Sequence, residues 1–171
     1  MDIREVVRIV SRGTTEIINP EGLEKKLQTG RPLVVKAGFD PTAPDIHLGH
    51  VVLLRKMKQF QDLGHRVFFL IGDFTAQIGD PTGQNKLRKR MSPEEIEENA
   101  RTYKAQVFKV LDPQRTDVVF NSSWFKNFSA QDLMVTMAHG TANQTLARDD
   151  FQKRMQAGKG ISLMEMIYPM L

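Results

Sequence analysis

The sequence predicts an α/β fold in which a parallel β-sheet carries helices on both faces. Short apolar runs alternate with amphipathic segments in the order strand, helix, strand, helix, strand, which is typical of a parallel sheet. The run Val67–Ile71 is apolar at every position, as expected for a central strand covered on both faces. Two predicted strands lead into turns rich in glycine, proline and aspartate. Ligands of parallel sheets bind at such turns, beyond the carboxyl ends of the strands.

A helical segment is predicted before the sheet begins. Two short helices are expected there. The second has Asn19 as its N-cap, Pro20 at its first helical position and Gly30 just after its end. The first strand follows as a short apolar run, Leu33–Ala37.

A long amphipathic helix is predicted from about Ile46 to Leu63, with Gly64 ending it. Its expected buried stripe is apolar and consists of Val52, Leu53, Met57, Phe60 and Leu63. Its expected solvated side is charged and consists of Arg55, Lys56, Lys58 and Asp62.

Beyond the central strand, a glycine- and proline-containing loop is expected as far as Met91. The sequence Ser92-Pro93-Glu94-Glu95 is a capping box with proline at the first helical position, so a helix is predicted from there to about Leu111. The remaining signals are a third strand and two further helix starts, at Asp117–Phe120, Ser129 and Ser162 respectively.

Composition limits the classes of function. Of the residues, 40% are hydrophobic and 26% charged, as in soluble globular proteins. There is no cysteine, which excludes disulfides and thiolate metal sites. No apolar run approaches the roughly 20 residues of a membrane span, and the N-terminus lacks the features of a signal peptide. A cytoplasmic protein is expected; the net charge of +4 only mildly favours an anionic partner.

The turn after the first strand contains His-Leu-Gly-His at residues 47–50. Histidines three positions apart lie on one face of a helix, here in its first turn, where unpaired N–H groups attract phosphate. Two ring N–H donors there can stabilise charge on a transferring phosphate. Gly49 leaves room for a flat base, and Thr42 adds a hydroxyl. The alternative is that both histidines are helix caps or surface residues. A zinc site lacks a third ligand nearby.

The turn after the central strand carries two aspartates, Asp73 and Asp80, within a stretch of three glycines and a proline. Either carboxylate can accept hydrogen bonds from a substrate ammonium. The alternative is an Asx-type turn, in which an aspartate bonds its own backbone.

Several motifs, taken in order, resemble the tyrosyl-tRNA synthetase family. These are A-G-F-D-P-T-A-P-D-I-H-L-G-H at residues 37–50, I-G-D-P-T-G at residues 78–83 and I-S-L-M-E-M-I-Y-P-M-L at residues 161–171. The resemblance extends over residues 36–171. It implies a Rossmann-like, class I synthetase nucleotide-binding fold.

The resemblance implies that the first turn binds ATP. The implied ATP-binding residues are Gly38, Asp40, Thr42, His47, Gly49 and His50. Among them Thr42, His47 and His50 would be catalytic. ATP would be a substrate that brings Mg²⁺ with it, and no protein-bound metal is expected.

The resemblance also implies a tyrosine pocket. Asp80 and Tyr168 would bind the substrate ammonium, while Leu70 and Thr75 would line the pocket. The remaining implied tyrosine-binding residues are Lys36 and Asn121, with Trp124 beside the site. Lys36-Ala37 replaces a tyrosine that some members place before the first turn, and Leu53 replaces a threonine.

The implied activity is tyrosine–tRNA ligation, with L-tyrosine, ATP and tRNA(Tyr) as partners and a homodimer as the assembly. In the dimer region the family resemblance and the apolar residues Met134, Met137, Phe151 and Leu163 favour self-association. Residues 1–32 are expected to be the helical segment and residues 33–171 an incomplete, truncated class I catalytic domain. The second class I motif, a lysine-rich loop, and the tRNA anticodon-binding domain are expected to be absent. Residues 89–92, Lys-Arg-Met-Ser, only superficially resemble that loop. The chain alone is therefore expected to be inactive.

Two alternatives remain. One is another nucleotidyltransferase with the His-x-Gly-His element, including the tryptophanyl enzyme, which should lack the two quoted turn motifs in combination. The other is a non-enzymatic module that keeps the fold and binds RNA or a protein.

Overall fold

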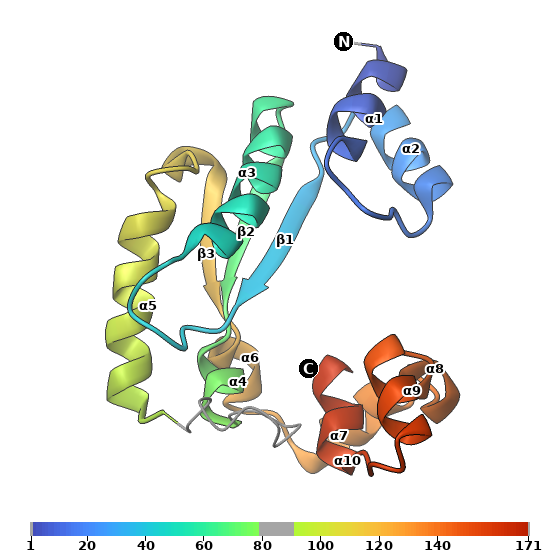
Figure 1. Cartoon of the computed structure of the whole chain (residues 1–171). Helices are drawn as coiled ribbons and strands as arrows, with labels where there is room; N and C mark the ends of the chain where they lie inside the picture. Colours follow the sequence, from blue (N-terminus) through green and yellow to red (C-terminus); the bar gives the residue numbers. More distant parts are fainter. Residues whose placement is uncertain (1, 79–90, 171) are drawn as a thin grey trace.

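A three-stranded parallel sheet forms the centre of the computed structural model, which describes residues 2–78 and 91–170 (Figure 1). Its strands are β1 (Val34–Phe39), β2 (Arg66–Ile71) and β3 (Thr116–Phe120), in the order β1-β2-β3. The strands run parallel and in register, so their carboxyl ends meet at one edge. The predicted Rossmann-like parallel sheet is thus confirmed.

The main core lies on one face of this sheet. Because side chains alternate along a strand, Val67, Phe69 and Ile71 share that face, and all are fully buried. The crossover helices α3 (Leu48–Asp62) and α5 (Pro93–Val107) both pack against it. Successive right-handed crossovers that move the same way across a sheet place their helices on the same face.

On the other face of the sheet, a pocket lies near the carboxyl ends of the strands. Lys36, Gly38 and Leu70 point to this side, opposite Phe69 and its neighbours. Tyr168, in the short 3₁₀ helix η2 (Tyr168–Met170), lines a pocket with these residues. Helices therefore lie on both sides of the sheet, although the crossover helices share one face.

The two predicted N-terminal helices are present as α1 (Ile3–Ser11) and α2 (Pro20–Gln28). Asn19 caps α2 as predicted, with its side chain accepting a hydrogen bond from the backbone N–H of Gly22 at 2.9 Å. Helix α1 is held against α3 by Lys56, whose ammonium donates to the backbone carbonyls of Val10 and Arg12 at 2.9 and 2.7 Å.

The predicted buried stripe of the long helix is wrong in part. Leu54, Met57 and Gln61 form the buried side of α3, whereas Val52 is 72% exposed. Lys56, predicted to be solvated, is half-buried under the N-terminal segment. The sheet contacts a side of the helix that also has spacing i, i+3, i+7, and local periodicity does not distinguish two such sides.

The loop predicted between the central strand and Met91 also needs correction, because Asp73–Ile78 forms the helix α4. The helix is held by long-range bonds. The backbone N–H of Phe74 donates to Oδ1 of Asn121 at 2.8 Å, and Oδ1 of Asp73 accepts from the backbone N–H of Ser122 at 2.9 Å. The rest of the predicted loop, residues 79–90, lies outside the described residues.

A group of short helices follows β3 and the preceding 3₁₀ turn η1 (Pro113–Arg115). These helices are α6 (Ser122–Phe125), α7 (Ala130–Met137), α8 (Ala142–Leu146), α9 (Asp149–Gln156) and α10 (Leu163–Ile167). Ser129 and Ser162 cap α7 and α10 as predicted. Arg154 and Glu165 form an ion pair with little solvent exposure that joins α9 to α10.

The exposure of apolar side chains and the character of the helices are relevant to association with a second copy and with membranes. Met134, Met137 and Leu163 are exposed, whereas Phe151, expected to be incompletely covered, is only 2% exposed and packs inside this helical group. Among the described helices, none combines the length and the apolar character that crossing a membrane requires.

Candidate active site at the carboxyl edge of the sheet

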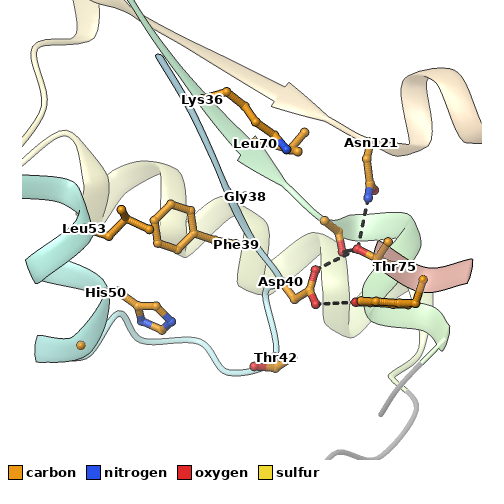
Figure 2. Close-up of a pocket in the computed structure, with 13 residues that line it drawn as sticks. Lys36, Gly38, Phe39, Asp40, Thr42, His50, Leu53, Leu70, Thr75 and Asn121 are labelled. Atoms are coloured by element: carbon orange, nitrogen blue, oxygen red, sulfur yellow. Dashed lines mark hydrogen bonds between the residues drawn. The ribbon is translucent and has the colours of Figure 1, made fainter. Parts of the chain in front are cut away.

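A pocket of about 480 Å³ opens at the carboxyl edge of the sheet (Figure 2). Its lining comes from the strand ends, the first turn of α3, helix α4 and the distant residues Asn121 and Tyr168. The remaining lining residues are Lys36, Gly38, Phe39, Asp40, Thr42, Gly49, His50, Leu53, Leu70, Gly72 and Thr75. This is the position at which parallel α/β sheets bind ligands.

The two histidines cap the N-terminus of α3 and stack on each other. The Nδ1 atom of His47 accepts from the backbone N–H of Gly49 at 3.1 Å. The Nδ1 atom of His50 accepts from the backbone N–H of His47 at 3.3 Å. The ring centroids are 3.9 Å apart. His50 lines the pocket, while His47 is exposed beside it.

These contacts fix the chemistry of both rings. With Nδ1 accepting, a neutral imidazole carries its proton on Nε2, so each ring offers an N–H donor. Burial lowers the pKa of His50, and the adjacent His47 lowers it further. His50 is therefore a neutral donor near pH 7. A capping role does not exclude a role in binding phosphate, because each ring uses only Nδ1 for the cap and can still donate from Nε2.

A hydrogen-bond network crosses the floor of the pocket and centres on the carboxylate of Asp40. Its Oδ1 accepts from the hydroxyl of Thr75 at 2.8 Å, and its Oδ2 accepts from the hydroxyl of Tyr168 at 3.0 Å. Asn121 donates from Nδ2 to the Thr75 hydroxyl at 3.1 Å. The network brings together the residues directly after β1 and β3, Asp40 and Asn121, with Thr75 of α4 and Tyr168 of η2.

Gly72 lies under this network with no room for a side chain. A Cβ atom built there would lie 2.1 Å from Oδ1 of Asp40 and 2.5 Å from Oγ1 of Thr75. The glycine lets the chain turn from β2 into α4 directly beneath the carboxylate. Gly72 and Phe39 were not among the predicted site residues, and Leu53 was named only as the replacement of a threonine. For Gly72, the available signal was a glycine directly after a buried strand.

The structure gathers most of the predicted site residues in this one pocket. Of the predicted ATP-binding residues, all line it except His47, which stacks on His50. Of the predicted tyrosine-binding residues, Lys36, Leu70, Thr75, Asn121 and Tyr168 line it. Asp80 lies outside the described residues.

Two other residues considered from sequence have different surroundings. Asp73 bonds the backbone N–H of Ser122 and so joins α4 to α6, which favours a structural role. Trp124 is 42% exposed, contacts Phe125 and is not among the residues that line the pocket. Within residues 2–78 and 91–170, no three histidine, aspartate or glutamate side chains gather as a metal site.

Comparison with known proteins places this geometry in context. The family model described as tRNA synthetases class I (W and Y) matches residues 28–171. The tyrosine–tRNA ligase of Aquifex aeolicus is 57% identical over 171 residues, which cover 100% of this chain and 44% of that protein. The tyrosine–tRNA ligase of Xanthomonas axonopodis pv. citri is 54% identical, over 99% of this chain and 42% of that protein. The chain thus spans less than half the length of these relatives.

Solved structures show the same fold. A C-terminally truncated mitochondrial tyrosyl-tRNA synthetase from Coccidioides posadasii superposes with a TM-score of 0.73 at 27% identity, over 96% of this chain and 48% of that one. A tyrosyl-tRNA synthetase from Archaeoglobus fulgidus, complexed with L-tyrosine, also gives a TM-score of 0.73. Its identity is 22%, and the match covers 99% of this chain and 50% of that one.

Proposed function

Because the chain belongs to the class I tRNA synthetases of the tryptophanyl and tyrosyl type, we propose that its pocket is the ATP- and tyrosine-binding part of a tyrosine–tRNA ligase. The observation that carries this proposal is the pocket itself. It joins His50, at a helix N-terminus, to a polar network around Asp40.

The ATP phosphates lie at the start of α3 in this proposal. The helix N-terminus, the Nε2–H groups of His47 and His50 and the hydroxyl of Thr42 all favour negative charge there. Gly49 lines the pocket, but the space that its side chain would take is filled by the ring of His47, 2.9 Å from the position of a Cβ atom, so only the family resemblance assigns the adenine to this turn. Mg²⁺ enters on ATP as part of the substrate.

The tyrosine occupies the Asp40 side of the pocket. Its ammonium donates hydrogen bonds, and the side-chain oxygen atoms of Thr75, Asn121 and Tyr168 can accept them on this side of the pocket. The family resemblance assigns the same role to Asp80. Leu70 and Leu53 supply apolar walls for the ring. Lys36 lines the same pocket and is our candidate for the residue that contacts the far end of the substrate.

The reaction proceeds in two steps. A carboxylate oxygen of tyrosine attacks the α-phosphorus of ATP, the bond to the bridging oxygen breaks, and pyrophosphate leaves with that electron pair. The terminal ribose hydroxyl of tRNA(Tyr) then attacks the adenylate carbonyl, and AMP leaves. The residues of this chain position the reactants and stabilise charge on phosphate.

The assembly we propose is a cytoplasmic homodimer that uses the exposed apolar side of α7 and α10. Met134 and Leu163 are 73% and 76% exposed, as expected for residues that a second copy covers. Sedimentation velocity at rising concentration should show dimers, and a monomer at high concentration would count against the assembly.

We also propose that residues 1–32 form a helical segment distinct from the catalytic domain.

Calorimetric titration tests the binding proposal. ATP and tyrosine should each bind saturably. His50→Ala should lower the affinity for ATP more than it lowers the affinity for tyrosine. Equal ATP affinity in both proteins would refute the placement of the phosphates. Tighter binding of tryptophan than of tyrosine would favour the tryptophanyl alternative.

A further inference from the structure

Four aromatic rings form a continuous series of contacts from the core of the sheet to the start of α3. Phe69, which is fully buried in β2, stacks on Phe39 with ring centroids 4.7 Å apart. Phe39 and His50 meet edge to face, with centroids 5.7 Å apart and an interplanar angle of 66°. His50 in turn stacks on the exposed His47. This ring series connects the pocket histidine to the core through Phe39.

Phe39 is the inner support of His50 in the ring series. It is the last residue of β1, is 6% exposed, and lies opposite Ile71 in the parallel register. Because side chains alternate along a strand, its ring lies on the face of the sheet that α3 and α5 cover. Figure 2 shows the ring directed from the strand toward α3, on the same side as His50. Edge-to-face contact favours one mutual orientation of two rings, so Phe39 restricts how His50 can turn.

The other contacts of His50 leave one of its nitrogens for a ligand. Besides Phe39 and His47, its ring meets Tyr103 of α5 with centroids 6.0 Å apart. Its Nδ1 accepts from the backbone N–H of His47, and no described residue accepts from its Nε2. His50 lines the pocket, and Figure 2 shows its ring extending from α3 toward Thr42. The packing therefore holds the ring while Nε2–H stays available.

The same packing limits the access of water to the ring. Burial is the largest cause that lowers the pKa of His50, and the adjacent His47 is the second. Phe39 contributes to this burial without adding a charge. The titratable groups packed on the ring are His47, from the helix turn, and Tyr103, from α5. The pKa of Tyr103 is raised, mainly by burial, so this phenol is neutral near pH 7.

We propose that Phe39 is a positioning residue of the candidate active site, which holds the ring of His50 in one orientation with its Nε2–H free to donate into the pocket. Phe39 acts through His50 and not by chemistry of its own. Its backbone carbonyl also accepts from the N–H of Gly72 at 2.9 Å, at the turn beneath Asp40. The ring of Phe39 thus supports one side of the pocket and its backbone the other.

NMR of the chain labelled with ¹⁵N-histidine tests the proposal. The chain has four histidines, so the signals of each ring can be assigned by replacement. In the wild-type chain, neutral His50 should carry its proton on Nε2, and its pKa should lie below the ordinary value of about 6.5. A nuclear Overhauser effect should connect the ring protons of His50 to those of Phe39.

Phe39→Met keeps a flexible apolar side chain at this position and removes the ring. It should raise the pKa of His50 towards the ordinary value, because water gains access, and the tautomer with the proton on Nδ1 should become populated. Phe108→Met is the matched control, because Phe108 packs on the same core and, among the described residues, makes no ring contact with His50. The control should leave the pKa and the tautomer of His50 unchanged.

Addition of ATP separates this proposal from the proposed function, on which the identity of the ligand rests. ATP should shift the Nε2 signal of His50 in the wild-type chain, and Phe39→Met should weaken ATP severalfold. If ATP leaves that signal unmoved while Phe39→Met still changes the pKa and the tautomer, the assignment of ATP fails and the positioning role stands.

Three results would overturn the positioning role. One is an unchanged pKa and tautomer of His50 in a folded Phe39→Met chain, and another is an equal change in the Phe108→Met control. The third is the absence of the Overhauser effect between Phe39 and His50 in the wild-type chain, a measurement that does not depend on the folding of any variant.

Discussion

The hydroxyl of Tyr168 donates a hydrogen bond to Oδ2 of Asp40 at 3.0 Å, across 128 positions of the sequence. The other oxygen of Asp40 accepts from Thr75. The end of β1 is thereby joined to α4 and to the C-terminal helical group at one carboxylate. The shape of the polar side of the pocket depends on this junction.

Tyr168→Phe should remove one link of the junction. We expect a loss of about 0.5–1.5 kcal/mol in the free energy of unfolding and a severalfold weaker affinity for tyrosine. Urea denaturation and calorimetry measure the two effects. Unchanged tyrosine affinity would show that the hydroxyl does not shape the binding site.

Tyr103→Phe makes the same chemical change in the core and should have the opposite outcome. The hydroxyl of Tyr103 is fully buried without a hydrogen-bond partner among the described residues. Its removal should leave the free energy of unfolding unchanged or raise it, since no bond is lost. A drop as large as that of Tyr168→Phe would reveal a partner for this hydroxyl.

Gly72→Ala should disrupt the pocket from below. The added methyl group would overlap the Asp40 carboxylate and the Thr75 hydroxyl, so the network must move. We expect about 1–3 kcal/mol of destabilisation and at least tenfold weaker binding of tyrosine. Gly160→Ala is the matched control, because a Cβ atom there meets nothing within 4 Å. Equal effects of the two changes would contradict the account of Gly72.

The stability of the chain should fall as the pH is lowered through about 6.5, partly because of His65. Burial lowers the pKa of His65, and its Nδ1 must stay unprotonated to accept from Leu33. Two charged residues, Arg31 and Asp62, line the same cavity as His65 at the amino ends of the strands. Below the ordinary histidine pKa the unfolded chain takes up the proton first, so stability is lost as the pH falls. Urea denaturation at pH 7.5 and 5.5 should show this loss, and His65→Asn should reduce it. An equal pH dependence in that variant would exclude His65 as the cause.

Much of the fold could be predicted from local sequence. The fully apolar run of β2 and the capping serines Ser92, Ser129 and Ser162 correspond to elements of the structure. These signals are local, because a capping box lies within four residues. The apolar composition of β2 predicts burial on both faces, but only Val67, Phe69 and Ile71 are buried, whereas Phe68 and Leu70 on the other face are half-buried.

The errors occur where long-range contacts decide the structure. Helix α4 has six residues, too few for a clear periodic pattern, and it depends on bonds to Asn121 and Ser122. The buried side of α3 depends on the position of the sheet. The bond between Asp40 and Tyr168 was not predicted, because no local pattern relates residues so far apart.

The proposed ATP chemistry of the site rests on His50. In the product of the complete gene, His50→Ala removes a neutral donor from the start of α3 and should reduce the rate of tyrosine-dependent pyrophosphate exchange by about 10²–10³. His139→Ala should have no such effect, since His139 is exposed beyond α7 and does not line the pocket. Equal rates in His50→Ala and wild type would contradict the proposed role of the turn.

Tyrosine-dependent exchange of labelled pyrophosphate into ATP tests the central claim most directly. The product of the complete gene should be assayed with tyrosine and with tryptophan, beside a polypeptide of residues 1–171 alone. We predict exchange with tyrosine only, its loss in Asp40→Asn, and none from residues 1–171 alone, which span less than half the length of the tyrosine–tRNA ligases that they match. Exchange driven by tryptophan, or robust exchange by residues 1–171 alone, would contradict the account.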